Sequence, residues 1–521
     1  MPIMRTRIVS SFLAGLVVVA VGGFAGDVFS SLFVSTGATQ AHGKEAAVLL
    51  ADQRSQTSQE VTTSIRSLPT ADGFRGIWYA NQPSGDEYRF KYSGGMATYP
   101  QQHMPIAIYA EAANKTFFFF FGGRNAEKNE LLHMISYFDH ETGLVARPRV
   151  LLNKKTSDAH DNPTLAIDDD GHFWIFSNAH GTGRRAYIHR STQPYAIDEF
   201  ELIRDENFSY GQPWHLPEHG FVFLHTHYDA GRRMLYQWRS STGREWGERE
   251  PLSRIEKGQY QVSLLHEQTL ATAFNMHPEP VGLNARANLY YMQTQDGGDT
   301  WTNAAGEDLN LPLTERDNAA LAIDSIADEQ LVYLKDIAFT SAGQPVVLYL
   351  NSSGYESGPK NDPRMLRVAH FDGDTWQVRD VTTTDHNYDY ALLSIDRDAD
   401  GNETWSVLGT TEPGPQPFCT GGEISLWTSR DYGTTWTKRR QLTTNSNWNH
   451  NFPRRPHNAH PDFSALWADG NALELSRSRM YFTNRDGTAV WQLPEVIEGD
   501  AMMAEPIRAA TPATFAVDAV D

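Results

Sequence analysis

Histidine, arginine and tyrosine side chains recur along this chain beside short apolar runs, at a spacing of about fifty to seventy residues, the length of a four-stranded blade. Imidazole exchanges protons near neutral pH, and guanidinium neutralises anions. For any one of these residues alone, a structural hydrogen bond is the best explanation. Because many of them occupy equivalent positions in a repeat, we expect the set as a whole to form one shared site. The set comprises His103, Arg124, His160, Asn162, His180, His225, His227, Tyr228, Asn275, His277, Tyr388, Arg454, Arg455 and His457.

Carboxylates are scarce in this set, the obvious ones being Asp161, Asp389 and Glu412. A typical glycosidase needs two placed carboxyl groups. A sialidase would need an arginine triad, and its Arg-Ile-Pro signature is not found. A uronate lyase instead neutralises the substrate carboxylate with Arg, His or a metal, removes the C5 proton with His or Tyr, and protonates the leaving oxygen. The inventory therefore favours β-elimination over hydrolysis.

Bulk composition limits the partners and the means of stabilisation. The 521 residues carry a net charge of −20, which argues against nucleic acid as the main partner, although a local basic pocket can still bind an anion. The single cysteine, Cys419, excludes an intramolecular disulfide and a multi-thiolate metal site. Hydrophobic residues at 40% are typical of a globular chain.

The elements that must position these groups are short strands. Seven apolar segments follow polar leads at His103, His160, Gln212, Tyr260, Lys335, Tyr388 and His457. A second series, one strand later, stops at polar clusters such as SNAHG at 177–181. In a propeller, the innermost strand of each blade begins at one end of the axial channel, and the next strand ends at that same end. The polar residues of both series would then lie together there. We therefore expect an all-β, seven-bladed β-propeller of four-stranded antiparallel blades over residues 70–495.

A turn motif supports this architecture. Residues 294–301 and 429–436 share the pattern Ser/Thr-x-Asp-x-Gly-x-Thr-Trp, and weaker copies end at Trp246, Trp376 and Trp491. The motif resembles the Asp-box turn that joins the third and fourth strands of propeller blades. Asp caps such a turn and Gly adopts positive φ.

The chain ends are predicted to lie outside the propeller. Residues 1–41 resemble an export signal, with Arg5 and Arg7 before an apolar run; an uncleaved anchor is the alternative. Residues 42–69 are a predicted linker and 496–521 a C-terminal tail. We expect a secreted protein, extracellular or periplasmic, that is monomeric and has no membrane partner after export.

The sequence resembles the β-propeller ulvan lyases, polysaccharide lyase families 24 and 25, within the BNR-repeat group. The resemblance covers nearly all of residues 70–495. It is carried by GFRGIWYANQ at 73–82, KYSGGMATYPQQHMPIAIY at 91–109, AHDNPTLAIDDDGHFWIFSNAHG at 159–181, NARANLYYMQTQDGGDTW at 284–301, DHNYDYALLSID at 385–396, GGEISLWTSRDYGTTW at 421–436 and NFPRRPHNAHPDFSALWADG at 451–470.

The resemblance implies a catalytic set of two His, a Tyr and a charge-neutralising Arg. The two His correspond to His160 and His180. The Tyr is assigned to Tyr228, with Tyr210 as the alternative. The Arg is assigned to Arg286, with Arg232 as the alternative. Relatives often carry Arg where His227 stands, so this sequence departs from the family pattern at that position.

The implied substrate is ulvan, a sulfated acidic algal polysaccharide of 3-sulfated rhamnose with glucuronate or iduronate. Sulfate would explain the additional cations Arg454, Arg455 and His457. A non-catalytic carbohydrate-binding propeller, a hydrolase and a lyase for another uronate polymer are the alternatives. The chemistry requires no cofactor; the resemblance allows a structural calcium or zinc ion, for which the sequence identifies no ligands.

Overall fold

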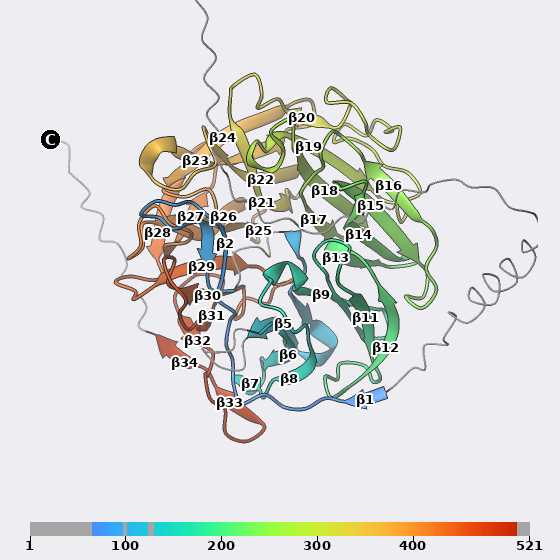
Figure 1. Ribbon diagram of the computed structural model, residues 1–521, viewed down its shortest axis with the longest axis vertical. Helices are drawn as coiled ribbons and strands as arrows, with labels where there is room; N and C mark the ends of the chain where they lie inside the picture. The colour runs from blue at the N-terminus through green and yellow to red at the C-terminus, as the bar shows by residue number, and fades with distance from the viewer. Residues whose placement is uncertain (1–64, 97–101, 123–129, 508–521) are drawn as a thin grey trace, which may run out of the picture. The chain divides into compact units, whose positions relative to one another are not determined.

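The structure, a computed structural model, describes residues 65–96, 102–122 and 130–507. Within these ranges the strands form seven antiparallel sheets arranged around a common centre, and one separate hairpin (Figure 1). The same residues contain no α-helix, and none of their helical turns is long and apolar enough to cross a membrane. The predicted seven-bladed β-propeller is confirmed.

Each blade is a meander whose first strand lies nearest the centre (Figure 1). The first three blades comprise β4 (Ala107–Ala110), β5 (Lys115–Gly122), β6 (Leu132–Asp139), β7 (Leu144–Ala146) and β8 (Arg149–Asn153); β9 (Pro163–Ile167), β10 (Phe173–Ser177), β11 (Ala186–Ser191) and β12 (Glu199–Glu206); and β13 (Ser209–Leu216), β14 (Gly220–Asp229), β15 (Arg232–Ser240) and β16 (Arg249–Ser253).

The other four blades follow the same order along the chain. They comprise β17 (Gln261–His266), β18 (Thr269–Met276), β19 (Ala287–Thr294) and β20 (Leu321–Ile323); β21 (Leu331–Phe339), β22 (Pro345–Ser352), β23 (Arg364–Phe371) and β24 (Trp376–Thr384); β25 (Ala391–Arg397), β26 (Glu403–Glu412), β27 (Glu423–Ser429) and β28 (Thr437–Gln441); and β29 (Asn449–Arg454), β30 (Ala465–Gly470), β31 (Met480–Thr483) and β32 (Val490–Gln492).

Alternating side chains of each strand fill the interfaces between neighbouring blades. In β5, Phe117 and Phe119 pack with second-blade residues such as Phe173, whereas Phe118 packs with seventh-blade residues such as Phe463. Successive side chains of a strand point to opposite faces, so one phenylalanine run serves two interfaces. Among the described residues, seven hydrophobic clusters lie between adjacent blades, and the cluster between the fifth and sixth blades also includes Tyr92, Tyr210 and Tyr260 near the centre.

Segments from outside the predicted 70–495 span also join the blades. β1 (Ile65–Ser67), within the predicted linker, pairs with β12. β33 (Ala501–Met503) pairs with β7 of the first blade, and β34 (Glu505–Ile507) pairs with β32 of the seventh. Residues 501–507, within the predicted tail, therefore connect the first and last blades. A parallel bridge between Ile108 and His457 closes the ring near its centre.

Both strong copies of the turn motif join a third strand to a fourth, as predicted. Asp296 accepts hydrogen bonds from the Thr300 N–H at 3.0 Å and from Thr294 Oγ1 at 2.7 Å. Gly298 has φ +88°, in the left-handed region that a side chain would disfavour. Trp301 is buried between the third and fourth blades.

The hairpin of β2 (Tyr79–Pro83) and β3 (Phe90–Gly94) reaches the inner strands of several blades. Tyr92 packs against Tyr388, with ring centroids 4.7 Å apart, and Lys91 Nζ donates to Asn284 Oδ1 at 2.5 Å. Gly95 N–H donates to Asn451 Oδ1 at 3.1 Å. The hairpin lies at the end of the propeller where β9 begins and β10 ends, here called the proximal end; the opposite end is called distal.

The two C-terminal edge strands generate the first prediction. A chain that ends after Gly499 lacks β33 and β34, and so loses the backbone pairing that connects the first and seventh blades. We expect its Tm to fall by roughly 3–5 °C in calorimetry. The control is a chain that ends after Arg508, which keeps both strands. Equal Tm values for the two chains would show that the connection adds no stability.

Candidate active site

His160 and His180 meet because they border two adjacent strands at the same end. His160 lies in the 3₁₀ turn η3 (Ala159–Asp161), directly before β9, and His180 follows β10. The two strands pair antiparallel, with Pro163 opposite Ser177. The imidazole rings stack with centroids 3.9 Å apart and planes 12° apart. This confirms that the structure brings these two predicted catalytic residues together.

One carboxylate holds both rings. Asp158 Oδ1 lies 2.5 Å from His160 Nδ1, and Asp158 Oδ2 lies 2.8 Å from His180 Nδ1. Asp158 also caps η3 by accepting the His160 main-chain N–H. If each Nδ1 carries the proton it donates to Asp158, each Nε2 presents a lone pair. Asp158 thus selects the same tautomer for both imidazoles.

Burial and charge set the protonation of this group. Burial raises the pKa of Asp158, but the hydrogen bonds from His160 and His180 outweigh it and hold that pKa well below its usual range. Burial lowers the pKa of His160, and Asp158 opposes this shift only in part. His160 is therefore neutral at pH 7, while Asp158 is ionised.

A guanidinium connects this group to a second buried carboxylate. Arg184 donates through its terminal NH2 to Asp158 Oδ2 at 2.6 Å and to Asp161 Oδ1 at 2.6 Å. Lys154 Nζ lies 3.4 Å from Asp161 Oδ2. Because the Asp161 side chain is fully buried, these cations must balance its charge. Asp161 is thus a structural carboxylate.

Two tyrosines contact His160, and a third lies beside one of them. The Tyr79 hydroxyl from the hairpin lies 3.3 Å from His160 Nδ1, and the Tyr210 ring lies edge-on to His160 with centroids 5.9 Å apart. Tyr228, on β14, lies beside Tyr210 and beside the guanidinium of Arg233, whose Cζ is 5.6 Å from the Tyr228 ring centroid. Burial raises the pKa of Tyr228, and Arg233 counteracts this, so the phenol is protonated at neutral pH.

Arg286, the predicted neutralising residue, lies in a cage of aromatic rings. Its Cζ is 4.8 Å from the ring centroids of both Tyr260 and Tyr333, and it donates to the Tyr388 hydroxyl at 2.8 Å. Only 1% of Arg286 is exposed. Its charge reaches neighbouring groups: burial and then Arg286 lower the pKa of Lys91 to about 6.

A polar cavity of about 340 Å³ opens beside Arg233 and is lined by Ala230, Gly231, Arg232, Arg233, Lys257, His277, Glu279, Gly282 and Leu283. Arg232, the predicted alternative to Arg286, is half exposed and lies 3.8 Å from Glu279. Burial, followed by Arg286 and Arg233, holds the pKa of His277 well below its usual range. The cavity therefore concentrates arginine and lysine charge next to the Tyr228 side chain.

His103 and Asn162 also belong to this site. His103 Nε2 lies 3.1 Å from the His160 carbonyl oxygen, and its ring packs on Tyr210. Both side-chain polar atoms of Asn162 are buried without a hydrogen-bond partner among the described residues. Buried polar atoms normally have partners, so Asn162 is placed to contact a ligand or a water. Asn275 instead bridges the Tyr260 N–H and the Val332 carbonyl.

Two predicted residues lie inside the third blade rather than beside His160. His225 stacks on Phe223 at 4.9 Å, and His227 contacts Tyr236 edge-on at 5.3 Å. They alternate along β14 with Tyr228, whose side chain points to the opposite face of the sheet. Arg124 lies outside the described residues.

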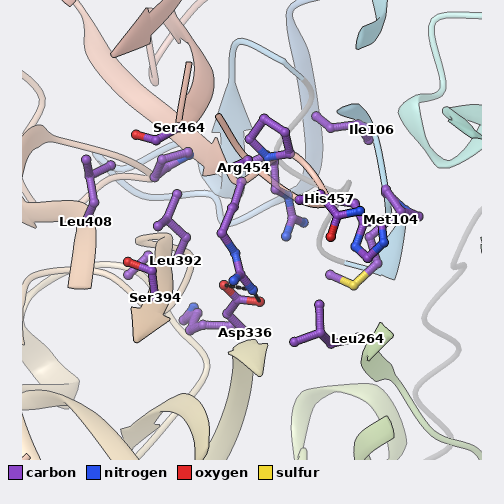
Figure 2. Close-up of a pocket in the computed structure, with 18 of the residues that line it drawn as sticks. Met104, Ile106, Leu264, Asp336, Leu392, Ser394, Leu408, Arg454, His457 and Ser464 are labelled. Carbon is purple, nitrogen blue, oxygen red and sulfur yellow. Dashed lines mark hydrogen bonds and ion pairs between the residues drawn. The ribbon is translucent and has the colours of Figure 1, made fainter. Parts of the chain in front are cut away.

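Arg454, Arg455 and His457 lie away from the proximal site. They line an axial cavity of about 300 Å³ between the inner strands, together with Asp336 (Figure 2). Arg455 donates to the Ile337 carbonyl at 3.1 Å and lies 3.4 Å from Asp336. The sequence analysis treated them as the lead of the seventh innermost strand. That strand is β29, which ends with Arg454, so Arg455 and His457 follow the strand toward the distal end instead of preceding it.

Sequence reasoning missed Asp158, Tyr79, Arg184 and Arg233. Asp158 had a detectable signal, since an Asp two residues before His160 is suited to cap a turn. Arg233 adjoins the predicted Arg232, and strand alternation decides which of the two faces Tyr228. The hairpin that carries Tyr79 has no counterpart in the strand repeat. Arg184 lies in the loop between β10 and β11, beyond the polar cluster that ends at Gly181.

Asp158, His160 and His180 also offer one potential metal-ligand atom each, all within 4.8 Å of one another. Both Nδ1 atoms already face Asp158, an arrangement that serves hydrogen bonding without an ion. Of the carboxylates expected near the site, Glu412 pairs with Lys438 at 2.7 Å, and burial raises the pKa of Asp389 well above its usual range. Neither forms a carboxylate pair with Asp161.

The buried ion network generates the second prediction. Replacing Arg184 with Ala leaves the charge of Asp161 opposed only by Lys154, and we expect the free energy of unfolding to fall by about 3 kcal/mol. The matched control is Arg185→Ala, which removes an exposed pair with Asp205 and should cost under about 1 kcal/mol. Denaturant titration measures both. Equal losses would contradict the assignment of Asp161 as a buried, balanced charge.

Comparison with known proteins gives consistent results. Residues 127–384 match the model of the BNR repeat-containing family. The chain is 21% identical over 392 residues to an ulvan lyase of Alteromonas sp. (strain LOR), covering 64% of this chain and 73% of that protein.

Solved structures show the same fold. A polysaccharide lyase PL25 ulvan lyase superposes with a TM-score of 0.61 at 17% identity, covering 81% of this chain and 96% of that one. A second structure of that description, bound to -[GlcA(1-4)Rha3S]-, superposes with a TM-score of 0.60 over the same shares at 17% identity. The resemblance to the β-propeller ulvan lyases predicted from the sequence is therefore confirmed.

Proposed function

We propose that this protein is a polysaccharide lyase that cleaves ulvan by β-elimination at the uronate linked to 3-sulfated rhamnose. The observation that carries the proposal is the stacked pair His160 and His180, fixed in one tautomer by Asp158 and bordered by Tyr228 and Arg233. Relatives named ulvan lyases, one of them bound to GlcA(1-4)Rha3S, support this substrate.

The imidazole pair supplies the base. A base must be unprotonated at the working pH and must reach the C5 proton of the uronate. His160 is almost fully buried, whereas 30% of the His180 side chain is exposed. The Nε2 of His180 takes the C5 proton, and the Nε2 of His160, which presents a lone pair, accepts a hydrogen bond from a hydroxyl group of the uronate beside it.

Tyr228 supplies the acid. As the C5–H bond breaks, its electron pair forms the C4–C5 double bond and the bond from C4 to the leaving oxygen breaks. The protonated phenol of Tyr228 gives its proton to that oxygen. The new non-reducing end is a 4,5-unsaturated uronate, and the new reducing end belongs to rhamnose.

Arg233 suits the charge-neutralising role better than Arg286. The enolate that develops at C5 spreads its charge onto the carboxylate, so a cation must reach that group. Arg233 is partly exposed and lies beside Tyr228, whereas Arg286 is enclosed by three tyrosines. Arg286 then acts at longer range: burial lowers the pKa of His277 most, and the charge of Arg286 lowers it further.

The cavity beside Arg233 fits the sulfate of the adjoining rhamnose. Arg232 and Lys257 are additional cations on its wall, and guanidinium and ammonium groups both bind sulfate oxygens well. We further propose that the protein acts after export, in the extracellular or periplasmic space, as a monomer. A polymer substrate of this size is encountered outside the cytoplasm.

The main competing function is a non-catalytic carbohydrate-binding propeller. It predicts retention on ulvan without a new ultraviolet chromophore, whereas elimination creates a conjugated unsaturated uronate. A lyase for another uronate polymer would form that chromophore on a different substrate. A panel of uronate polymers followed in the ultraviolet distinguishes these cases.

The third prediction tests the imidazole pair on ulvan. His160→Ala, His180→Ala and Asp158→Asn should each lower kcat/KM by about 10²–10⁴-fold, measured as unsaturated-uronate absorbance. Asp158→Asn acts through the tautomers of both rings. The matched control is His172→Ala, which changes a histidine at the distal end of the same β9–β10 pair and should keep full activity. Full activity of both His160→Ala and His180→Ala would refute the mechanism.

The fourth prediction separates the two arginines. Arg233→Ala should lower kcat/KM by about 10²-fold, because the enolate loses its neutralising partner. Its neighbour Arg232→Ala should affect mainly KM, by less than about tenfold. Arg286→Met should lower Tm as well as activity. An Arg233→Ala variant as active as the parent, with Arg286→Met inactive but equally stable, would return the role to Arg286.

A further inference from the structure

A second cluster of metal-ligating side chains lies at the distal end, where the first and seventh blades meet. His140 follows β6 of the first blade, and His460 and Asp462 lie in the loop between β29 and β30 of the seventh. Each residue offers one ligand atom, and these atoms all lie within 4.8 Å of one another. The cluster takes no part in the proposed lyase chemistry.

His140 has the hydrogen-bonding arrangement that is typical of a metal-ligating histidine. Its Nε2 lies 2.8 Å from Thr116 Oγ1, which can accept the Nε2 proton. Its Nδ1 is buried without a hydrogen-bond partner among the described residues. Metal-ligating histidines usually donate their other ring N–H to such an acceptor, which fixes the tautomer. In this tautomer Nδ1 presents a lone pair, which is available to an ion.

The other two ligands keep the site accessible. The side chain of His460 is 25% exposed and that of Asp462 is 67% exposed, and His460 Nδ1 lies 3.7 Å from Asp462 Oδ2. The rings of His140 and His460 have centroids 3.8 Å apart, and Tyr109 packs on both. Solvent can thus deliver an ion and supply a fourth ligand.

The donor set indicates the kind of ion. Two imidazoles and one carboxylate suit Zn²⁺ and neighbouring transition metals, whereas Ca²⁺ and Mg²⁺ prefer oxygen ligands alone. Zinc bonds of about 2.0–2.2 Å would require the three ligand atoms to move slightly closer together. Aromatic packing with Tyr109 accounts for the ring contacts, but it leaves His140 Nδ1 without a partner.

We propose that His140, His460 and Asp462 bind one Zn²⁺ ion that links the first blade to the seventh. Along the chain, the first and seventh blades are separated by the other five blades. The contact between these two blades therefore depends on noncovalent bonds. Near the cluster, Tyr109 N–H donates to the His457 carbonyl at 2.9 Å. The ion adds a coordinate link beside that hydrogen bond, at the position where the ring closes.

The test measures zinc content and thermal stability of the full chain. After chelator treatment and dialysis against ZnCl₂, the protein should retain one zinc that His140→Ala and Asp462→Asn abolish. Saturating ZnCl₂, at about 100 times Kd, should raise Tm of the parent by about 3 °C and leave Tm of both variants unchanged. Asp462 is exposed, so Asp462→Asn should fold even if His140→Ala does not.

Two controls locate the ion. His219→Ala changes an exposed histidine elsewhere and should keep both the zinc and the Tm shift. His180→Ala removes a ligand of the proximal Asp158 cluster and should also keep the distal zinc. Zinc lost in His180→Ala but kept in Asp462→Asn would overturn the proposal, as would a parent that retains no zinc.

Discussion

The structure depends on the alternation of side chains along its strands. Each inner strand belongs to one blade but contributes to two interfaces, because successive residues face opposite neighbours. The phenylalanine run of β5 shows this most clearly, with Phe117 and Phe118 buried in different clusters. A one-residue slip would exchange the two sets, so packing fixes the register of each blade and also the height at which its first strand begins.

The height at which the first strand of each blade begins determines where the candidate catalytic side chains lie. Because β9 begins where β10 ends, residues before the first strand meet residues after the second, and Asp158 can reach both His160 and His180. Asp158 itself takes no proton from the substrate; it orients the two imidazoles through their Nδ1 atoms. The same carboxylate is held by Arg184, so the site and the buried charge of Asp161 share one network.

The fold and the imidazole pair were predictable from the sequence because both follow from a repeat. Polar leads before apolar runs mark blade starts, and His160 and His180 occupy equivalent positions beside adjacent strands. Groups from outside the repeat were not predictable: Tyr79 comes from a hairpin that precedes the first blade. The prediction for the seventh blade was wrong because the polar residues near His457 follow β29, whereas His160 precedes β9.

The same strand geometry places the cationic residues in two groups, one in the axial cavity and one at the proximal end. Only the proximal group is placed to bind an anionic substrate. Arg455 faces Asp336 inside the axial cavity, so its charge is already balanced within the protein. Arg233 and Lys257 border a cavity at the proximal end, together with Arg232, which lies 3.8 Å from Glu279 in the same lining. A chain with a net charge of −20 repels a polyanion at long range, so its attraction must be local. Under the proposed function, the sulfate and the uronate are therefore assigned to the proximal cations, whereas Arg454 and Arg455 belong to the interior of the propeller.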